Sequence, residues 1–135
     1  MKVLIDTNIF VRFATRDLPD EAKVCQKLFD KIEEGKILPY ISLISFFEIN
    51  YLLTKTYSFS KEKTLKFLEE IMKLRNMTVL KKVEIDSVLS IYKKRRVGLA
   101  DALLISQMRK DFILCTYDKK LLSEVKNSQV PSEIV

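Results

Sequence analysis

The chain has 135 residues, of which 47% are hydrophobic and 31% are charged, a balance typical of one globular domain with a substantial core. It contains no histidine and only two glycines, which excludes a Ser-His-Asp or Cys-His couple, a histidine-bound zinc and a glycine-rich phosphate loop. The formal net charge of +6 favours a polyanionic partner.

The predicted elements alternate between strands and helices. The first, Val3-Leu4-Ile5, is a continuous apolar run, which favours a strand buried on both faces at the centre of a parallel sheet. The next elements in chain order are a helical turn Ile9–Ala14, a helix opened by Asp17-Leu18-Pro19 and ended by Gly35, a strand Ile37–Ile41 and an apolar helix Ser42–Tyr57. A helix capped by Ser60 and reaching Leu74, a strand Met77–Leu80 and a helix from Ile85 past Tyr92 follow. The last elements are a helix Leu99–Lys110, a strand Phe112–Cys115, a short helix through Val125 and an edge strand Val130–Val135. This order predicts an α/β fold with a parallel sheet covered by helices on both faces, as a single domain over residues 1–135.

Two aspartates follow predicted buried strands. Asp6 comes directly after the first strand and Asp118 comes shortly after Phe112–Cys115. Each has a structural alternative, because Asp6 can form an Asx-turn or a helix cap and Asp118 can cap the short helix behind it. If the two strands are adjacent and parallel, both carboxylates converge at the carboxyl edge of the sheet.

Two further acids stand within helical segments. Glu48 interrupts the apolar run Ile44–Leu52, where an uncompensated carboxylate would be costly to bury, so it needs a partner. A buried salt bridge to a Lys or Arg is its structural alternative. Asp101 stands among small residues after Gly98, and capping the helix is its structural alternative. Four carboxylates in one place cannot all ionise without a compensating cation, so the set predicts one or two divalent metals and hydrolysis at phosphorus.

The motifs around these acids together resemble a PIN domain, and within that family a VapC-type toxin ribonuclease. The resemblance covers nearly the whole chain through Leu4-Ile5-Asp6-Thr7-Asn8-Ile9, Ser45-Phe46-Phe47-Glu48-Ile49, Leu99-Ala100-Asp101-Ala102-Leu103-Leu104 and Leu114-Cys115-Thr116-Tyr117-Asp118-Lys119. It implies a three-layer α/β/α fold with a central parallel sheet of about five strands.

The resemblance also implies an activity and its residues. It implies Mg²⁺- or Mn²⁺-dependent endonucleolytic cleavage of RNA, with Asp6, Glu48, Asp101 and Asp118 as the acidic, metal-binding quartet. The polar residues Thr7, Asn8 and Thr116 match positions that orient acids or water. Homodimerisation and inhibition by an antitoxin protein are further expectations from the same source.

Three other interpretations stay open at this point. A stand-alone RNA-processing nuclease would differ from a toxin by lacking a neighbouring antitoxin. A phosphatase with Asp6 as nucleophile would usually need a second Asp where Asn8 stands. A non-catalytic RNA-binding module would not need intact acids.

The remaining features indicate the cellular setting. No apolar run approaches the roughly 20 residues of a membrane helix, and only three apolar residues precede Asp6, so we expect a cytoplasmic protein without a signal peptide. Cys25 and Cys115 lack a CxxC spacing and are expected to be reduced core thiols. The basic cluster Lys93–Arg96 is consistent with a polyanion site or with a solvated surface.

Overall fold

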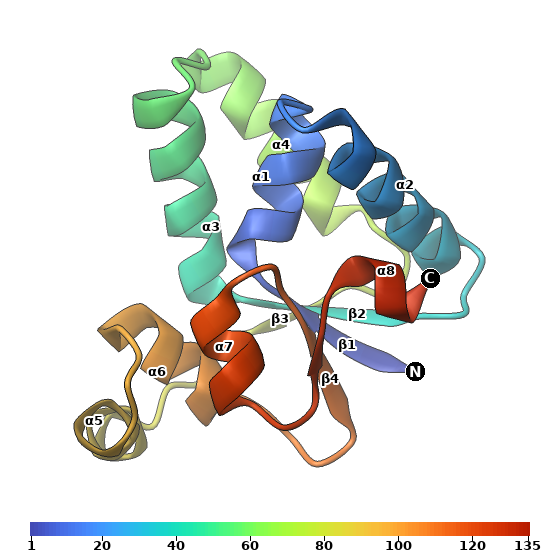
Figure 1. Ribbon diagram of the computed structural model, residues 1–135. Coiled ribbons are helices and arrows are strands. Elements are labelled where there is room, and N and C mark those ends of the chain that lie inside the picture. The colour runs from blue at the N-terminus through green and yellow to red at the C-terminus, as the bar shows by residue number, and fades with distance from the viewer.

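The computed structural model describes all 135 residues as a five-stranded sheet between two layers of helices (Figure 1). The strands are β1 (Lys2–Ile5), β2 (Leu38–Ser42), β3 (Thr78–Leu80), β4 (Phe112–Cys115) and β5 (Ser128–Gln129). The helices are α1 (Thr7–Thr15), α2 (Pro19–Glu33), α3 (Leu43–Tyr51), which continues as a π-helical turn (Leu52–Thr56), α4 (Lys61–Met72), α5 (Ile85–Lys94), α6 (Leu99–Ser106), α7 (Lys119–Glu124) and α8 (Pro131–Ile134). None of these helices is both long and apolar enough to cross a lipid bilayer.

The sheet has the order β3-β2-β1-β4-β5 and every pairing is parallel. Strand β1 is therefore central, and Val3, Leu4 and Ile5 are completely buried, as the continuous apolar run predicts. Ile5 pairs with Cys115 in β4, so the chain leaves both strands at the same edge. That edge is where ligands bind in open parallel sheets.

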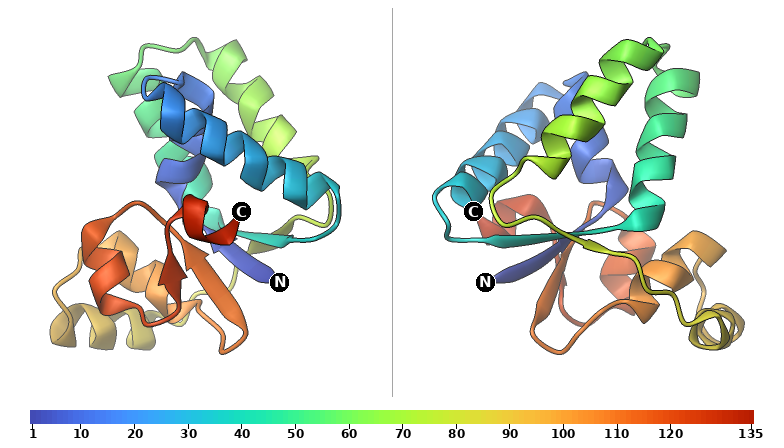
Figure 2. Two further views of the ribbon diagram at one scale, coloured as in Figure 1. Left: turned by 45° about the vertical axis from the view of Figure 1, so that its right-hand side comes forward. Right: turned by 180° about the vertical axis from the view of Figure 1, so that it is seen from behind.

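The two helical layers correspond to two apolar clusters. Helices α1 to α4 and α8 cover one face, where residues such as Phe10, Leu28 and Ile49 pack on the sheet (Figures 1 and 2). Helices α6 and α7 cover the other face through Leu104 and Leu121. The predicted three-layer α/β/α architecture is confirmed.

Several local signals fix the helix ends as expected. Pro19 begins α2, where its missing N–H costs no hydrogen bond, and Gly35 ends that segment with a φ of 77°. The hydroxyl of Ser60 caps α4 by accepting a hydrogen bond from the Lys63 backbone N–H at 3.1 Å.

Three predictions about element boundaries were wrong. The predicted edge strand Val130–Val135 is helix α8, because Pro131 suits a first helical position and the Glu133 side chain accepts from the Val130 N–H at 3.0 Å. The edge strand beside β4 is instead β5, which precedes α8 in the chain. Helix α6 ends at Ser106 instead of Lys110, and the turn predicted over Ile9–Ala14 is a longer helix beginning at Thr7.

Candidate active site

Asp6 lies at the carboxyl end of the central strand, with 8% of its surface exposed. Its Oδ1 atom accepts a hydrogen bond from the Thr7 backbone N–H at 2.8 Å, so Asp6 caps α1. Its Oδ2 atom accepts from the Thr116 hydroxyl, also at 2.8 Å. Both carboxylate oxygens are thus fixed in direction by the segments that follow β1 and β4.

Thr116 also connects Asp6 to Asp118. Its hydroxyl oxygen accepts a hydrogen bond from the Asp118 backbone N–H at 2.9 Å while it donates to Asp6. Asp118 caps α7, because its Oδ1 atom accepts from the N–H groups of Lys120 and Leu121 at 2.8 and 3.2 Å. The cap expected for Asp118 is therefore present, and its half-buried carboxylate starts from the same sheet edge as Asp6.

Glu48 reaches this edge from α3. The Thr7 hydroxyl donates a hydrogen bond to its Oε1 atom at 2.8 Å. The ion pairs of the structure include none with Glu48, so the salt bridge considered as its structural alternative is not present. The carboxylate is half-buried and has no lysine or arginine partner.

Asp101 comes from the first turn of α6. The cap of this helix is Gly98, and Asp101 is the third helical residue, so the capping alternative does not apply. Its half-buried side chain makes no hydrogen bond within the protein, and the backbone of Gly98 accepts the first helical bond from the Ala102 N–H at 2.9 Å.

Charge interactions link the four acids in pairs: Asp6 with Asp101 and Glu48, and Asp101 with Asp118 and Glu48. The pKa of Asp6 is raised to about 6. Burial is the largest cause, hydrogen bonds from Thr116 and Thr7 act against it, and the charges of Asp101 and Glu48 add to it. Burial also raises the pKa of Asp101, followed by the charges of Asp118 and Glu48. The charges of neighbouring acids thus oppose the ionisation of Asp6 and Asp101, whereas the charge of Lys120 favours that of Asp101.

The donor set suits a hard divalent cation with an open coordination sphere. No three of the Asp, Glu or Cys side chains lie close enough together in this conformation to hold one metal ion. Three carboxylate oxygens at this edge already accept hydrogen bonds, from the Thr7 N–H, the Thr116 hydroxyl and the Lys120 N–H. Mg²⁺ usually keeps several waters and binds proteins through only one or two carboxylates. A cluster of uncompensated oxygen ligands at a sheet edge matches that requirement and offers nothing to soft metals.

The two other predicted polar residues behave differently. Thr7 is buried and hydrogen bonds to Glu48, whereas Asn8 is exposed and makes no side-chain hydrogen bond. Neither of these placements tests a role in catalysis. Both cysteines are buried and unpaired, as expected for core thiols.

Sequence reasoning missed Arg95 and Glu124, which join the segment before α6 to the end of α7. Their only sequence signal was the basic cluster to which Arg95 belongs. A contact between residues 29 positions apart has no periodicity that could reveal it.

Comparison with solved structures places the fold among known ones. PAE2754 from Pyrobaculum aerophilum is 18% identical, with a TM-score of 0.70 over 99% of this chain and 92% of that one. A toxin-antitoxin complex from Klebsiella pneumoniae is 17% identical, with a TM-score of 0.65 and coverages of 96% and 97%. VapBC2 from Rickettsia felis, bound to a DNA fragment from the promoter, is 18% identical, with a TM-score of 0.64 and the same coverages. At these identities the likeness concerns the fold.

A comparison with curated protein sequences finds no match. A family model described as PIN domain matches residues 3–127, which run from within β1 to beyond α7 and include all four acids. The motifs noted in the sequence, the parallel sheet and the acidic edge agree with that match. The chain belongs to the PIN domain family.

Proposed function

We propose that the protein is a divalent-metal-dependent endoribonuclease whose active site is the acidic edge formed by Asp6, Glu48, Asp101 and Asp118. The observation that carries the proposal is the mutual effect of the acids. The charges of Asp101 and Glu48 act on the pKa of the buried Asp6, and no lysine or arginine pairs with Glu48. Membership of a family of nucleases supports the same conclusion.

Asp6, Asp101 and Asp118 would hold Mg²⁺ or Mn²⁺, with Glu48 holding a second ion or orienting water. Such an ion, when bound, activates water and stabilises negative charge on the scissile phosphate. The Thr116 hydroxyl and the Thr7 N–H fix the direction of the Asp6 carboxylate. The Thr7 hydroxyl fixes one oxygen of Glu48, which leaves the other free to accept a proton from a water molecule.

A cleavage assay on a mixed RNA pool tests the proposal. Wild-type protein should cleave with Mg²⁺ or Mn²⁺ and stop in chelator, and Asp101→Asn should lower the rate by about 100-fold or more because it removes a charged ligand. Asp111→Asn is the matched control, since it makes the same change at an exposed residue paired with Lys2 at 2.8 Å at the opposite end of β4. Cleavage that persists in chelator, or in Asp101→Asn, would contradict the assignment.

We further propose that the nuclease is the toxin of a toxin-antitoxin pair. Two of the similar structures are the toxin-antitoxin complex from Klebsiella pneumoniae and VapBC2 from Rickettsia felis. This chain has an apolar groove of about 240 Å³ between α1, α2 and α4, into which Phe10, Phe13, Phe29 and Phe67 project. The exposed acids Asp30, Glu33 and Glu70 line the same groove, so a helical antitoxin segment with basic residues beside apolar ones suits it.

Coexpression with the product of an adjacent small reading frame tests the pairing. The antitoxin should copurify with the protein and suppress RNA cleavage, and Phe67→Glu should weaken the complex by at least tenfold. Unchanged affinity in Phe67→Glu would place the partner elsewhere, and the absence of any adjacent frame would favour a stand-alone RNA-processing enzyme.

A homodimer is the remaining proposal about assembly. Helix α3 exposes Leu43, Phe47 and Tyr51, and helix α5 exposes Ile85, Leu89 and Tyr92 at helical spacing. Both helices lie at the left of Figure 1. Apolar stripes of this kind are typical of interfaces. Sedimentation should give a dimer for the wild type and a monomer for Phe47→Glu, and a monomeric wild type would refute the proposal.

A further inference from the structure

Asp101 is delivered to the acidic edge by a peripheral pair of helices. Val88 of α5 and Ala102 of α6 are buried together with Val97 from the segment between the helices, in an apolar cluster separate from the two that flank the sheet. In Figure 1 the pair lies below the sheet, beside α7. The position of Asp101 relative to the other acids therefore depends on how this pair is attached to the rest of the domain.

Two attachments lie in the C-terminal half of α6 or beyond it. Leu104 packs into the apolar cluster through which α6 and α7 cover one face of the sheet. Gln107 donates hydrogen bonds from Nε2 to the carbonyl oxygens of Lys82 and Leu80 at 3.2 and 3.4 Å. Asp101, however, lies in the first turn, ahead of both contacts.

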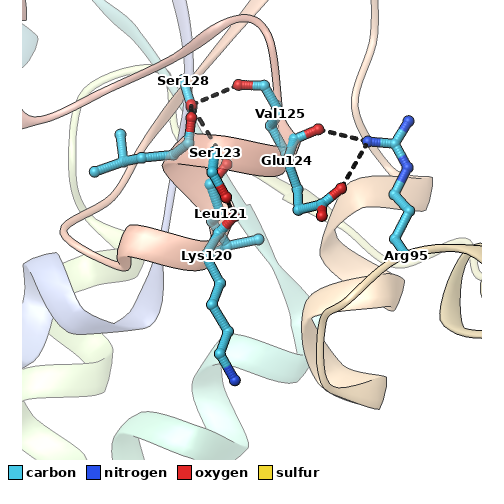
Figure 3. A network of polar contacts seen from close by, with 8 residues as sticks. Arg95, Lys120, Leu121, Ser123, Glu124, Val125 and Ser128 are labelled. Atoms are coloured by element: carbon cyan, nitrogen blue, oxygen red, sulfur yellow. Dashed lines mark hydrogen bonds and ion pairs between the residues drawn. The ribbon is translucent and has the colours of Figure 1, made fainter.

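A third attachment precedes the first turn of α6. The Arg95 side chain donates from Nη1 to the backbone carbonyl of Glu124, and the same nitrogen lies 3.8 Å from the Glu124 carboxylate oxygen Oε2 (Figure 3). The neighbouring Lys93, Lys94 and Arg96 are exposed and make no such contact. Arg95 is thus distinguished within the basic cluster by a specific partner.

That partner is the end of the helix that Asp118 begins. Ser128 in β5 donates to the Val125 carbonyl oxygen at 2.6 Å, so one side of this helix end is attached to the sheet (Figure 3). Arg95 satisfies the Glu124 carbonyl from the other side and brings a positive charge to the negative end of the helix. Helix α7 therefore bridges the sheet and the α5–α6 pair.

We propose that Arg95 is a positioning residue that keeps Asp101 opposite Asp118 by fastening the segment before α6 to the C-terminal end of α7. The inference rests on the proposed function. Asp101 and Asp118 carry like charges and repel each other, so a contact that opposes their separation favours a geometry in which both can bind one cation. Arg95 makes no hydrogen bond or ion pair with Asp101 or Asp118, and acts through its contact with the end of α7.

The test compares Arg95→Met with Arg96→Met, which removes the same charge from an exposed residue without a partner. Mn²⁺ affinity is measured by EPR of the free ion, apart from any cleavage, and kcat and KM for RNA are measured alongside. Arg95→Met should raise the Kd for Mn²⁺ by about tenfold and lower kcat, since residues that orient metal ligands have effects of this size. Arg96→Met should change the Kd by less than twofold, and any effect on RNA should be in KM.

Two further variants guard against a folding defect. Glu124→Gln keeps the backbone acceptor and should weaken Mn²⁺ binding less than Arg95→Met, and Arg95→Lys should restore part of the affinity. Equal Mn²⁺ affinity and kcat in Arg95→Met and Arg96→Met would overturn the proposal.

A wild type that binds no Mn²⁺ would refute the proposed function separately. In that case amide hydrogen exchange decides the positioning role. Faster exchange of the hydrogen-bonded amides from Ala102 onward in Arg95→Met than in Arg96→Met would support it, and equal exchange would overturn it.

Discussion

Replacing Asp6 by Asn should stabilise the metal-free protein at neutral and alkaline pH. The pKa of Asp6 is raised from 3.8 to about 6, so ionising it in the folded state costs about 3 kcal/mol at about 1.4 kcal/mol per unit. The amide loses the hydrogen bond that the Thr116 hydroxyl donates, which costs about 1 kcal/mol. The net gain of about 2 kcal/mol corresponds to a rise of about 8 °C in Tm for a chain of this length.

The pH dependence gives the sign of the effect. A raised carboxyl pKa contributes stability that is fully present below about pH 4, the unfolded value, and is lost as the pH rises through about 6. In thermal unfolding experiments with chelator at pH 8, the Tm of Asp6→Asn should therefore be higher than that of the wild type. Below pH 4 the Tm of Asp6→Asn should instead be lower than that of the wild type, because only the loss of the Thr116 hydrogen bond remains.

Asp111→Asn provides the comparison. Asp111 is exposed, and a hydrogen bond and the charge of Lys2 lower its pKa, so this substitution should not raise Tm at pH 8. If Asp6→Asn melts below the wild type at pH 8 in chelator, the electrostatic account of the site is wrong.

Three further predictions concern Thr7, Thr116 and Cys25. Thr7→Val removes the hydroxyl that donates to Glu48 and should lower kcat for RNA cleavage about tenfold at little cost in Tm; an unchanged kcat would mean that Glu48 needs no fixed orientation. Thr116→Val removes the bonds to Asp6 and Asp118 together and should lower the free energy of unfolding by about 2 kcal/mol in denaturant titrations, a loss that Thr116→Ser should largely restore. Burial raises the pKa of Cys25 to about 11, so an aromatic disulfide reagent should react with the folded protein far more slowly than with the unfolded chain, and equal rates would contradict a buried thiol.

The parts of the fold that follow from local patterns were predictable. The apolar run before Asp6 predicted a central strand, and the Pro19 and Ser60 signals predicted where two helices begin. The C-terminal segment was misread because Val130 and Val135 suggest a strand, whereas Pro131 and the Glu133 side chain stabilise a helical turn. Short segments of this kind are decided by capping, which a hydrophobicity pattern does not register.

The candidate site was likewise predictable only in part. Acids in apolar surroundings are conspicuous in a sequence, because an unpaired buried charge needs a reason, and this marked Glu48 and Asp6. Their hydrogen-bond partners were not predictable in detail. The Thr7 hydroxyl donates to Glu48, which is 41 positions away in the sequence, and Thr116 donates to Asp6, which is 110 positions away. Residues so far apart in the sequence become neighbours only through the tertiary fold, in which β1 lies between β2 and β4.

The position of β1 in the middle of the sheet has a consequence for biosynthesis. The first strand to leave the ribosome must wait for β4, since Ile5 pairs with Cys115, 110 positions later. At usual elongation rates that interval is about 5 to 20 seconds. A partly synthesised chain therefore lacks a complete acidic edge. If the proposed function holds, a nuclease built in this way would stay harmless to the messenger and the machinery producing it until nearly all of its domain has emerged.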